Sequence, residues 1–267
     1  GSYKTAQYLH KLCSENLIPS TFELGGKSPL IVDKDANLEI CAKRVCLGKF
    51  INCGQTCIAP DYLFVHKEVK EEYLELLKKY IKEFFGENPL QSENYGRLIN
   101  QRQFVRLQQL LSQGKILFGG KSNETEKYIS PTLIEPNNLT TSLMQEEIFG
   151  PILPVLEFED IENVITFINQ RPRPLALYYF GKKNTNIIKK TTSGGACIND
   201  AIMHIIPHNL QFGGIGQSGM GAYHGKKSFD TFSHYKSVLK TNKNFEFNIK
   251  YPPYSLFKQR LVKFFLR

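Results

Sequence analysis

The chain has 267 residues, of which 41% are hydrophobic and 22% are charged, so it can bury a sizeable core and is not compositionally disordered. Its net charge of +9 favours anionic partners. The basic residues are interpreted as dispersed over a solvated surface, and no RNA-binding or zinc-finger pattern is present, which argues against nucleic acid. No apolar run approaches the ~18 residues that a membrane span needs.

The predicted elements alternate between helices and strands. A helix is predicted at the start of the chain, in GSYKTAQYLHKL, with no strand before it. Apolar spacing then predicts helices over 38–50, 68–86 and 100–114, the last two ending at a glycine, with a strand over 61–66. The second half adds strands at 152–158, 175–180 and 195–199 and helices at 160–171 and 183–192. This alternation predicts parallel β-α-β units in an α/β fold.

Six cysteines are present, but their spacing predicts neither a metal site nor a disulfide framework. They are Cys13, Cys41, Cys46, Cys53, Cys57 and Cys197. No CxxC pair occurs and the histidines lie in separate motifs, so no metal is expected. A chain of this size needs no disulfides and shows no signal peptide, which predicts a reducing, cytoplasmic compartment.

The segment NCGQTCIAP (52–60) can be interpreted as a redox pair, half of a metal site, or one nucleophile with an inert neighbour. A reactive cysteine needs its thiolate, which backbone N–H groups at an exposed turn favour. Taken alone, Cys57 would more commonly be a small buried residue. Three glycine-containing motifs that also carry an acid or an aromatic ring favour an active site, because glycine allows close backbone approach. They are FELGGKSP (22–29), QEEIFGP (145–151) and FGGIGQSGMG (212–221).

Together these motifs resemble the aldehyde dehydrogenases, and in particular their class 3 branch. The resemblance rests on ELGGKSP, GQTCIAPDY, QEEIFGPILPV, FINQRPRPLALY and SGMGAYHGKKSFDTFSH, and YPPYS near the C-terminus is similar to the fatty aldehyde dehydrogenases. It implies an α/β aldehyde dehydrogenase-like catalytic domain with a parallel sheet and flanking helices. It also implies that the chain is the C-terminal, catalytic portion of such an enzyme. Most of the N-terminal cofactor domain, and an asparagine of the oxyanion hole, would then be missing.

The resemblance assigns the chemistry to two residues. Cys57 would be the nucleophile that attacks an apolar aldehyde, and Glu23 would be the general base that activates the hydrolytic water. The cofactor would be NAD or NADP. Glu147 would hydrogen-bond the nicotinamide ribose, and Phe149 would pack near the nicotinamide.

Further site residues are implied by the same resemblance. Ser2 would contact the cofactor pyrophosphate at a helix N-terminus, with a remnant of cloning at Gly1 and Ser2 as the less favoured alternative. Leu24 and Gly25 would lie near the nicotinamide. Asn199 and Phe212 would lie near the substrate entrance, and core packing is an equal interpretation for Phe212.

The expected organisation has four parts. They are a remnant of the dinucleotide-binding domain (1–24), the catalytic domain (25–217), an oligomerisation segment (218–250) and a basic amphipathic helix (251–267). A homodimer is expected. Residues 254–267 suit either a membrane surface, which would make the cytoplasmic protein peripheral to a membrane, or packing on a partner subunit.

Two alternatives to the dehydrogenase reaction remain open at this point. One is an inactive truncated fragment that only associates with full-length subunits. The other is a thiol redox protein that uses Cys53 and Cys57, although a disulfide across one helical turn would be strained.

Overall fold

The computed structural model describes residues 1–265, and the chain divides into two units, Gly1–Phe232 and Ser233–Arg267. The helices of the larger unit are α1 (Tyr3–Glu15), α2 (Leu38–Phe50), α3 (Lys70–Phe85), α4 (Gln101–Leu111), α5 (Ser142–Gln145), α6 (Ile161–Asn169), α7 (Ile187–Lys190) and α8 (Lys226–Thr231). Its strands are β1 (Phe22–Glu23), β2 (Pro29–Val32), β3 (Tyr62–His66), β4 (Gly114–Phe118), β5 (Ser122–Asn123), β6 (Tyr128–Ile129), β7 (Thr132–Pro136), β8 (Ile152–Phe158), β9 (Ala176–Phe180), β10 (Gly195–Ile198) and β11 (Gly219–Met220).

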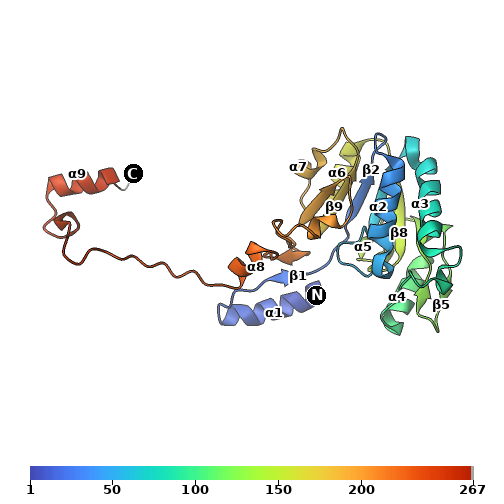
Figure 1. The fold of residues 1–267 in the computed structure, drawn as a ribbon, viewed down its shortest axis with the longest axis horizontal. Coiled ribbons are helices and arrows are strands. Elements are labelled where there is room, and N and C mark those ends of the chain that lie inside the picture. The colour runs from blue at the N-terminus through green and yellow to red at the C-terminus, as the bar shows by residue number, and fades with distance from the viewer. Residues whose placement is uncertain (266–267) are drawn as a thin grey trace. The chain divides into compact units, whose positions relative to one another are not determined.

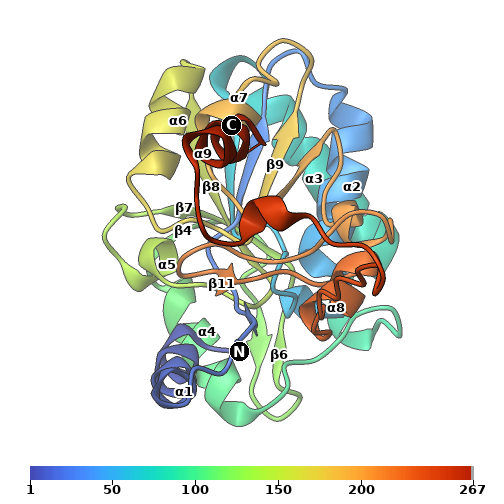
Figure 2. The same ribbon diagram turned by 90° about the vertical axis from the view of Figure 1, so that its left-hand side faces the viewer.

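A seven-stranded sheet forms the centre of the larger unit (Figure 1). Its strand order is β10-β9-β2-β3-β8-β7-β4, and every neighbouring pair is parallel except β7 and β4, which are antiparallel. Helices α2 and α3 cover one face of this sheet, and α6 and α7 cover the other (Figures 1 and 2). Sheets covered on both faces are typical of parallel α/β folds.

The central strands are buried on both faces, and their side chains alternate between two hydrophobic cores. In β2, Leu30 and Val32 belong to the core that includes α2 and α3, whereas Ile31 belongs to the core that includes α6 and α7. This two-residue period follows from the pleat of a strand. The two cores hold the sheet rigid, and the loops at its edge position the candidate site.

Most predicted elements of the sheet and its helices are confirmed. The predicted strand over 152–158 is β8, those over 61–66, 175–180 and 195–199 correspond to β3, β9 and β10, and the predicted helix over 38–50 is α2. The parallel arrangement is also confirmed.

Other predictions were wrong in extent. The helix expected over 100–114 ends at Leu111, and Gly114 begins β4 instead of capping the helix. Only Ile187–Lys190 is helical within the segment expected to be helical over 183–192. Strands β2, β4 and β7 were not predicted, and β4 is half-exposed without clear alternation.

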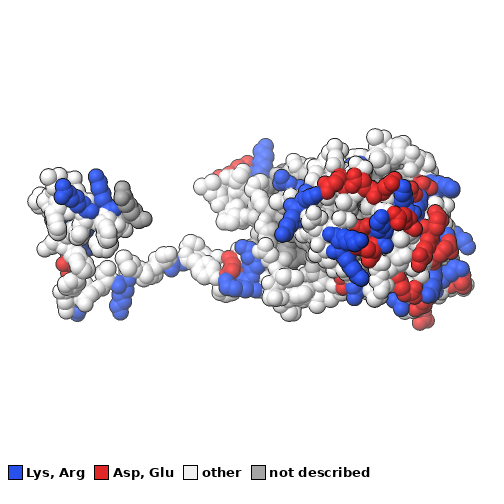
Figure 3. Space-filling model, turned by 90° about the horizontal axis from the view of Figure 1, so that it is seen from above, with Lys and Arg blue, Asp and Glu red and all other residues white. Residues whose placement is uncertain are grey.

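The smaller unit carries most of the net charge. Ser233–Arg267 contains eight Lys and Arg and one Glu, a net charge of +7, so Gly1–Phe232 contributes only +2 of the total of +9. Figure 3 shows acidic and basic side chains interspersed on the visible face of the larger unit. The expectation of dispersed basic charge is therefore wrong for the smaller unit.

A helix in the smaller unit agrees with the amphipathic helix expected at the C-terminus. Helix α9 spans Leu256–Phe265, and Arg267, which the prediction included, lies outside the described residues. Leu256, Phe257, Phe264 and Phe265 are each more than 70% exposed. Within residues 1–265, no helix is both long enough and apolar enough to cross a membrane.

Candidate active site

Three loops of the larger unit meet at one cleft of about 690 Å³. They are the segment between β1 and β2, the turn after α2, and the loop between α5 and β8. The residues that line the cleft are Gly1, Ser2, Glu23, Leu24, Gly25, Asn52, Gln55, Thr56, Cys57, Glu147 and Phe149. The cleft thus brings together all the expected catalytic and cofactor-binding residues, but not Asn199 and Phe212.

The turn before Cys57 has an unusual backbone. Asn52, Cys53 and Gly54 follow one another in the left-handed region, with φ values of 50°, 56° and 72°. Left-handed backbone is common for glycine but costs other residues roughly 1–2 kcal/mol, and Asn tolerates it best. This turn reverses the chain directly after α2 and directs Cys57 into the cleft.

Two glycines allow the three loops to pack against one another. A Cβ on Gly54 would lie 2.3 Å from the carbonyl oxygen of Gly150, so the nucleophile turn contacts the loop of Glu147 through backbone atoms. A Cβ on Gly25 would lie 2.1 Å from Glu147 Oε2, so this carboxylate packs directly against the Gly25 backbone. At Gly54 the obstacle is backbone, so no side chain would fit without displacing a loop, whereas at Gly25 the obstacle is the end of the Glu147 side chain.

Cys57 and Glu23 face each other and interact through their side chains. Antiparallel pairing of β1 with β11, in which Glu23 is opposite Gly219, fixes the position of Glu23. The two side chains are close enough to interact electrostatically, and burial followed by the negative charge of Glu23 raises the pKa of Cys57 to about 12. Burial also raises the pKa of Glu23. The resting cysteine is therefore a thiol whose proton can pass to a neighbouring carboxylate.

One oxygen of the Glu23 carboxylate is free to accept a hydrogen bond from a molecule in the cleft. Its Oε1 atom is buried and has no hydrogen-bond partner among the described residues. An unsatisfied buried acceptor is costly, and such groups are concentrated at functional sites. This oxygen can therefore receive a proton from water or from a bound molecule.

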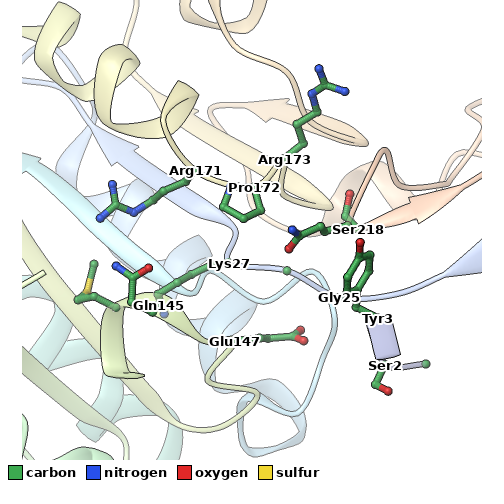
Figure 4. A pocket seen from close by; sticks show the side chains of 14 residues that line it. Ser2, Tyr3, Gly25, Lys27, Gln145, Glu147, Arg171, Pro172, Arg173 and Ser218 are labelled. Atoms are coloured by element: carbon green, nitrogen blue, oxygen red, sulfur yellow. The ribbon is translucent and has the colours of Figure 1, made fainter. Parts of the chain in front are cut away.

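Glu147 extends toward Gly25 and the start of α1 (Figure 4). Burial, and then the charge of Asp61, raises the pKa of Glu147 to about 7, while a hydrogen bond from the Gly26 backbone opposes this rise. A hollow of about 260 Å³ adjoins the cleft here and shares Gly1, Ser2, Gly25 and Glu147 with it. Glu147 therefore lines both the cleft and the adjoining hollow.

A buried ion pair holds the loop of Glu147. Lys27 Nζ lies 2.6 Å from Asp61 Oδ2 and also donates to the carbonyl of Glu146 at 2.9 Å. The other Asp61 oxygen accepts a hydrogen bond from the backbone N–H of Ile148 at 3.0 Å. Burial lowers the pKa of Lys27, and the charge of Asp61 opposes this. The pair therefore fixes the backbone on both sides of Glu147.

The remaining cofactor-site candidates lie around the rim and floor of the cleft. Ser2 caps α1, and its Oγ accepts a hydrogen bond from Thr5 N at 3.3 Å. Leu24 is buried, whereas Phe149 is 38% exposed and has a positive φ of 47°. An exposed ring in a strained backbone position is unusual for packing alone.

The two expected substrate residues lie elsewhere. The Asn199 amide bonds the N–H and C=O of Gly181, and the residue lines a separate hollow near α2. Phe212 is buried, and its ring packs edge-on against Tyr223 with centroids 5.8 Å apart. The pKa of Tyr223 is raised by burial and then by the charges of Glu23 and Cys57. Tyr223 therefore interacts both with Phe212 and with the pair Cys57 and Glu23.

Cys53 is a fully buried neighbour of the turn. Its Sγ donates a hydrogen bond to the Tyr95 hydroxyl at 3.5 Å, and burial raises its pKa to about 11. Cys53 is therefore inaccessible to reagents, whereas Cys57 lines the cleft.

Sequence reasoning missed several residues of the site: Lys27, Asn52, Gln55, Asp61 and Tyr223. Lys27 and Asp61 are charged residues within the motifs GGKSP and IAPDY, next to buried strands, and charged residues rarely lie there unless they are paired. That pattern could have indicated the ion pair. No comparable sequence pattern indicated that Tyr223 belongs to the site.

Comparison with known proteins agrees with this arrangement. Residues 1–238 match the family model described as the aldehyde dehydrogenase family, so the chain belongs to the aldehyde dehydrogenase family. The predicted resemblance and the predicted α/β fold are both confirmed.

The relatives include members of class 3. The chain is 47% identical over 259 residues to 4,4'-diaponeurosporen-aldehyde dehydrogenase of Staphylococcus aureus, covering 95% of this chain and 56% of that protein. It is 45% identical to mouse aldehyde dehydrogenase family 3 member A2, covering 100% of this chain and 56% of the relative. The mouse dimeric NADP-preferring aldehyde dehydrogenase is 46% identical, with 95% and 57% covered. The chain therefore spans just over half the length of these relatives.

A solved structure has the same fold. The structure described as the substrate-bound state of Staphylococcus aureus AldH superposes with a TM-score of 0.96 and 45% sequence identity, covering 100% of this chain and 59% of that one.

Proposed function

We propose that this chain provides the catalytic residues for NAD- or NADP-dependent oxidation of apolar aldehydes to carboxylic acids. The observation that carries the proposal is the contact between the Cys57 thiol and the Glu23 carboxylate inside the cleft that Glu147 and Phe149 also line. Thiol nucleophiles with an adjacent base are typical of covalent catalysis.

In the proposed reaction, the Cys57 sulfur forms a bond to the aldehyde carbon while the thiol proton passes through solvent to the carbonyl oxygen, which gives a thiohemiacetal. The raised pKa of Cys57 means that the resting sulfur holds this proton at neutral pH and must lose it as it attacks. When bound, NAD or NADP would accept the hydride from that carbon as the hydroxyl proton leaves to solvent. The thioester left on Cys57 is then hydrolysed by a water whose proton passes to Glu23, which releases the acid and restores the thiol.

The residues around the cleft fit such a cofactor. Helix α1 begins at the cleft, and free N–H groups at a helix N-terminus suit phosphate. Gly25 leaves the space beside Glu147 without a side chain. Ser2, Leu24, Gly25, Glu147 and Phe149 would hold the cofactor, and Glu147 would accept a hydrogen bond from a hydroxyl. One relative is named as NADP-preferring, and another is named for a 4,4'-diaponeurosporen-aldehyde; these names support the cofactor class and an apolar substrate.

A substrate-protection experiment tests the proposal independently of the cofactor. The full chain is treated with iodoacetamide with and without a long-chain aldehyde, and labelling of each cysteine is measured by peptide mass spectrometry. We expect selective protection of Cys57. A Cys53–Cys57 disulfide as the main product would instead support the redox alternative, which the burial of Cys53 opposes.

Turnover separates the enzyme from the inactive-fragment alternative. Reduced cofactor is measured with aldehyde and NAD or NADP, for this chain and for a chain extended to the full length of its relatives, each with a Cys57→Ser control. Turnover in the longer chain alone would support the alternative in which this part of the sequence acts only with full-length subunits. Light scattering would test the proposed homodimer, which one relative's name supports.

We also propose that the smaller unit contacts an anionic membrane surface. Its net charge of +7 and the exposed aromatic residues of α9 support this, because each basic residue near an anionic surface contributes about 1 kcal/mol. Sedimentation with phosphatidylserine-containing vesicles is compared with neutral vesicles, for the full chain and for one lacking residues 254–267. Binding that is equal for both chains would reject the role of this segment.

A further inference from the structure

The strained turn before Cys57 needs an external support. Asn52 and Cys53 both have left-handed backbone, and a non-glycine residue there costs roughly 1–2 kcal/mol. Such conformations persist only where the surroundings enforce them. The contacts of Gln55, which directly follows the turn Asn52–Gly54, show what enforces this conformation.

The side-chain amide of Gln55 makes three hydrogen bonds, all to backbone groups. Its Nε2 donates to the carbonyl of Asn52 at 3.1 Å and to the carbonyl of Arg97 at 3.0 Å. Its Oε1 accepts from the N–H of Ile99 at 2.9 Å. The two carbonyls require a donor and the N–H requires an acceptor, so only one orientation of the amide satisfies all three. The amide thus joins the turn to a distant segment.

That segment, Tyr95–Ile99, is itself held firmly. The Tyr95 hydroxyl donates to the carbonyl of Ile129 at 2.9 Å, and Leu98 N donates to the carbonyl of Lys127 at 3.0 Å. The Arg97 guanidinium donates to the carbonyl of Tyr95 at 3.0 Å and lies 5.3 Å from the centre of the Tyr128 ring. The segment is therefore a fixed platform.

A second set of contacts places the turn on this platform. A Cβ added at Gly96 would lie 3.5 Å from Cys53 Cβ, in ordinary van der Waals contact, so the turn and this segment are neighbours. Cys53 also bonds the Tyr95 hydroxyl. Within the turn, Asn52 Nδ2 donates to the carbonyl of Gln55 at 3.0 Å. Gln55 is the member of this set that also lines the cleft of Cys57.

We propose that Gln55 is a positioning residue: its amide fastens the turn Asn52–Gly54 to the segment Tyr95–Ile99 and so holds the Cys57 thiol facing Glu23. This inference rests on the proposed function, in which Cys57 and Glu23 act as a pair. Gln55 itself takes no part in the bond-making steps.

The test measures whether the charge of Glu23 still affects the rate at which Cys57 is alkylated. Alkylation of Cys57 by iodoacetamide is followed against pH in the full chain, with Cys13 as an internal reference, for the wild type, Glu23→Gln, Gln55→Leu and the double variant. In the wild type, Glu23→Gln is expected to speed alkylation, because it removes a neighbouring negative charge. In Gln55→Leu, we expect alkylation about tenfold faster than in the wild type, equivalent to one pKa unit, and no further effect of Glu23→Gln.

A conservative variant adds a readout that a simple packing role would not produce. In Gln55→Glu the ionised carboxylate would face the carbonyls of Asn52 and Arg97 and release the turn. Once protonated, the carboxyl can again donate one hydrogen bond and accept another, so wild-type behaviour should return at acid pH. Gln108→Glu, at an amide that bonds the exposed Ser122 side chain, is the matched control and should behave as the wild type throughout.

The outcomes separate this inference from the proposed function. If Glu23→Gln has no effect in the wild type, the proposed pair itself is wrong. If it has an effect that persists in both Gln55 variants, only the positioning role is overturned. If neither Gln55 variant is folded at any pH by circular dichroism, Gln55 is a general structural residue and the positioning role is again overturned.

Discussion

Lys27 and Asp61 form a buried ion pair, 2.6 Å apart, that ties the loop of Glu147 to the strand edge next to Cys57. Their side chains are only 11% and 3% exposed. The pair thus lies where the removal of one partner leaves the other as an uncompensated buried charge.

Asp61→Asn is therefore expected to lower the free energy of unfolding by about 3 kcal/mol, because Lys27 would lose its buried counter-charge. Denaturant unfolding measures this change. The matched control is Glu159→Gln, which removes the partner of Lys67 at the same N–O distance of 2.6 Å but on the surface. An equal loss in the two variants would contradict the importance of burial.

Gly25→Ala tests the contact between the Gly25 backbone and Glu147. The added methyl group would lie 2.1 Å from Glu147 Oε2, and overpacking of this kind costs about 1–3 kcal/mol. In a Glu147→Ala background the carboxylate is absent, so the same substitution should cost much less. Unfolding of the four variants in a double-mutant cycle measures the coupling, and additive effects would show that the clash is relieved elsewhere.

Glu23→Gln tests the electrostatic coupling of the catalytic pair. The charge of Glu23 raises the pKa of Cys57, so its removal should lower that pKa and speed alkylation of Cys57 at neutral pH, about tenfold for each pKa unit. The same variant should accumulate the thioester after reaction with an aldehyde and cofactor, because the water would lack its base. Mass spectrometry of the intact chain detects this adduct.

The raised pKa of Glu147 predicts that the stability of the fold depends on pH. Its pKa in the folded chain is about 7, above the ordinary 4.5, so the folded state favours the protonated carboxyl. Stability is then fully present below about pH 4.5 and falls as the pH rises to about 7, by roughly 3 kcal/mol. Relative to the wild type, Glu147→Gln should gain stability across this window, as measured by urea unfolding at several pH values. Glu146→Gln, at the exposed neighbour, should keep the wild-type slope.

Hydrophobic periodicity was enough to predict the central part of the fold. Strands such as β8 and β9 are long apolar runs, and α2 places its buried residues at helical spacing. The edge of the sheet was harder, because β4 is half-exposed and follows α4 after a short turn without a proline or a clear change of period. Gly114 therefore resembled a helix cap when its actual role is close packing against β7.

Sequence motifs indicated Cys57, Glu23 and Glu147 as candidate site residues, and all three line the same cleft. The site was not predictable where function depends on tertiary placement. Asn199 and Phe212 lie near the expected motifs, but hydrogen bonds to Gly181 and packing on Tyr223 keep them out of the cleft. The role of Gln55 could not be predicted for the same reason, since two of its three partners lie more than 40 residues away in the chain.

The backbone contact between Gly54 and Gly150 has a consequence for how this sequence can vary. Where two side chains touch, a larger residue on one side can be offset by a smaller one on the other. Here the partners are a Cα and a carbonyl oxygen, so no second substitution can restore the space. In a saturation mutagenesis library, position 54 should accept glycine alone, with no suppressor mutation elsewhere, while the neighbouring cleft residue Thr56 should tolerate several replacements.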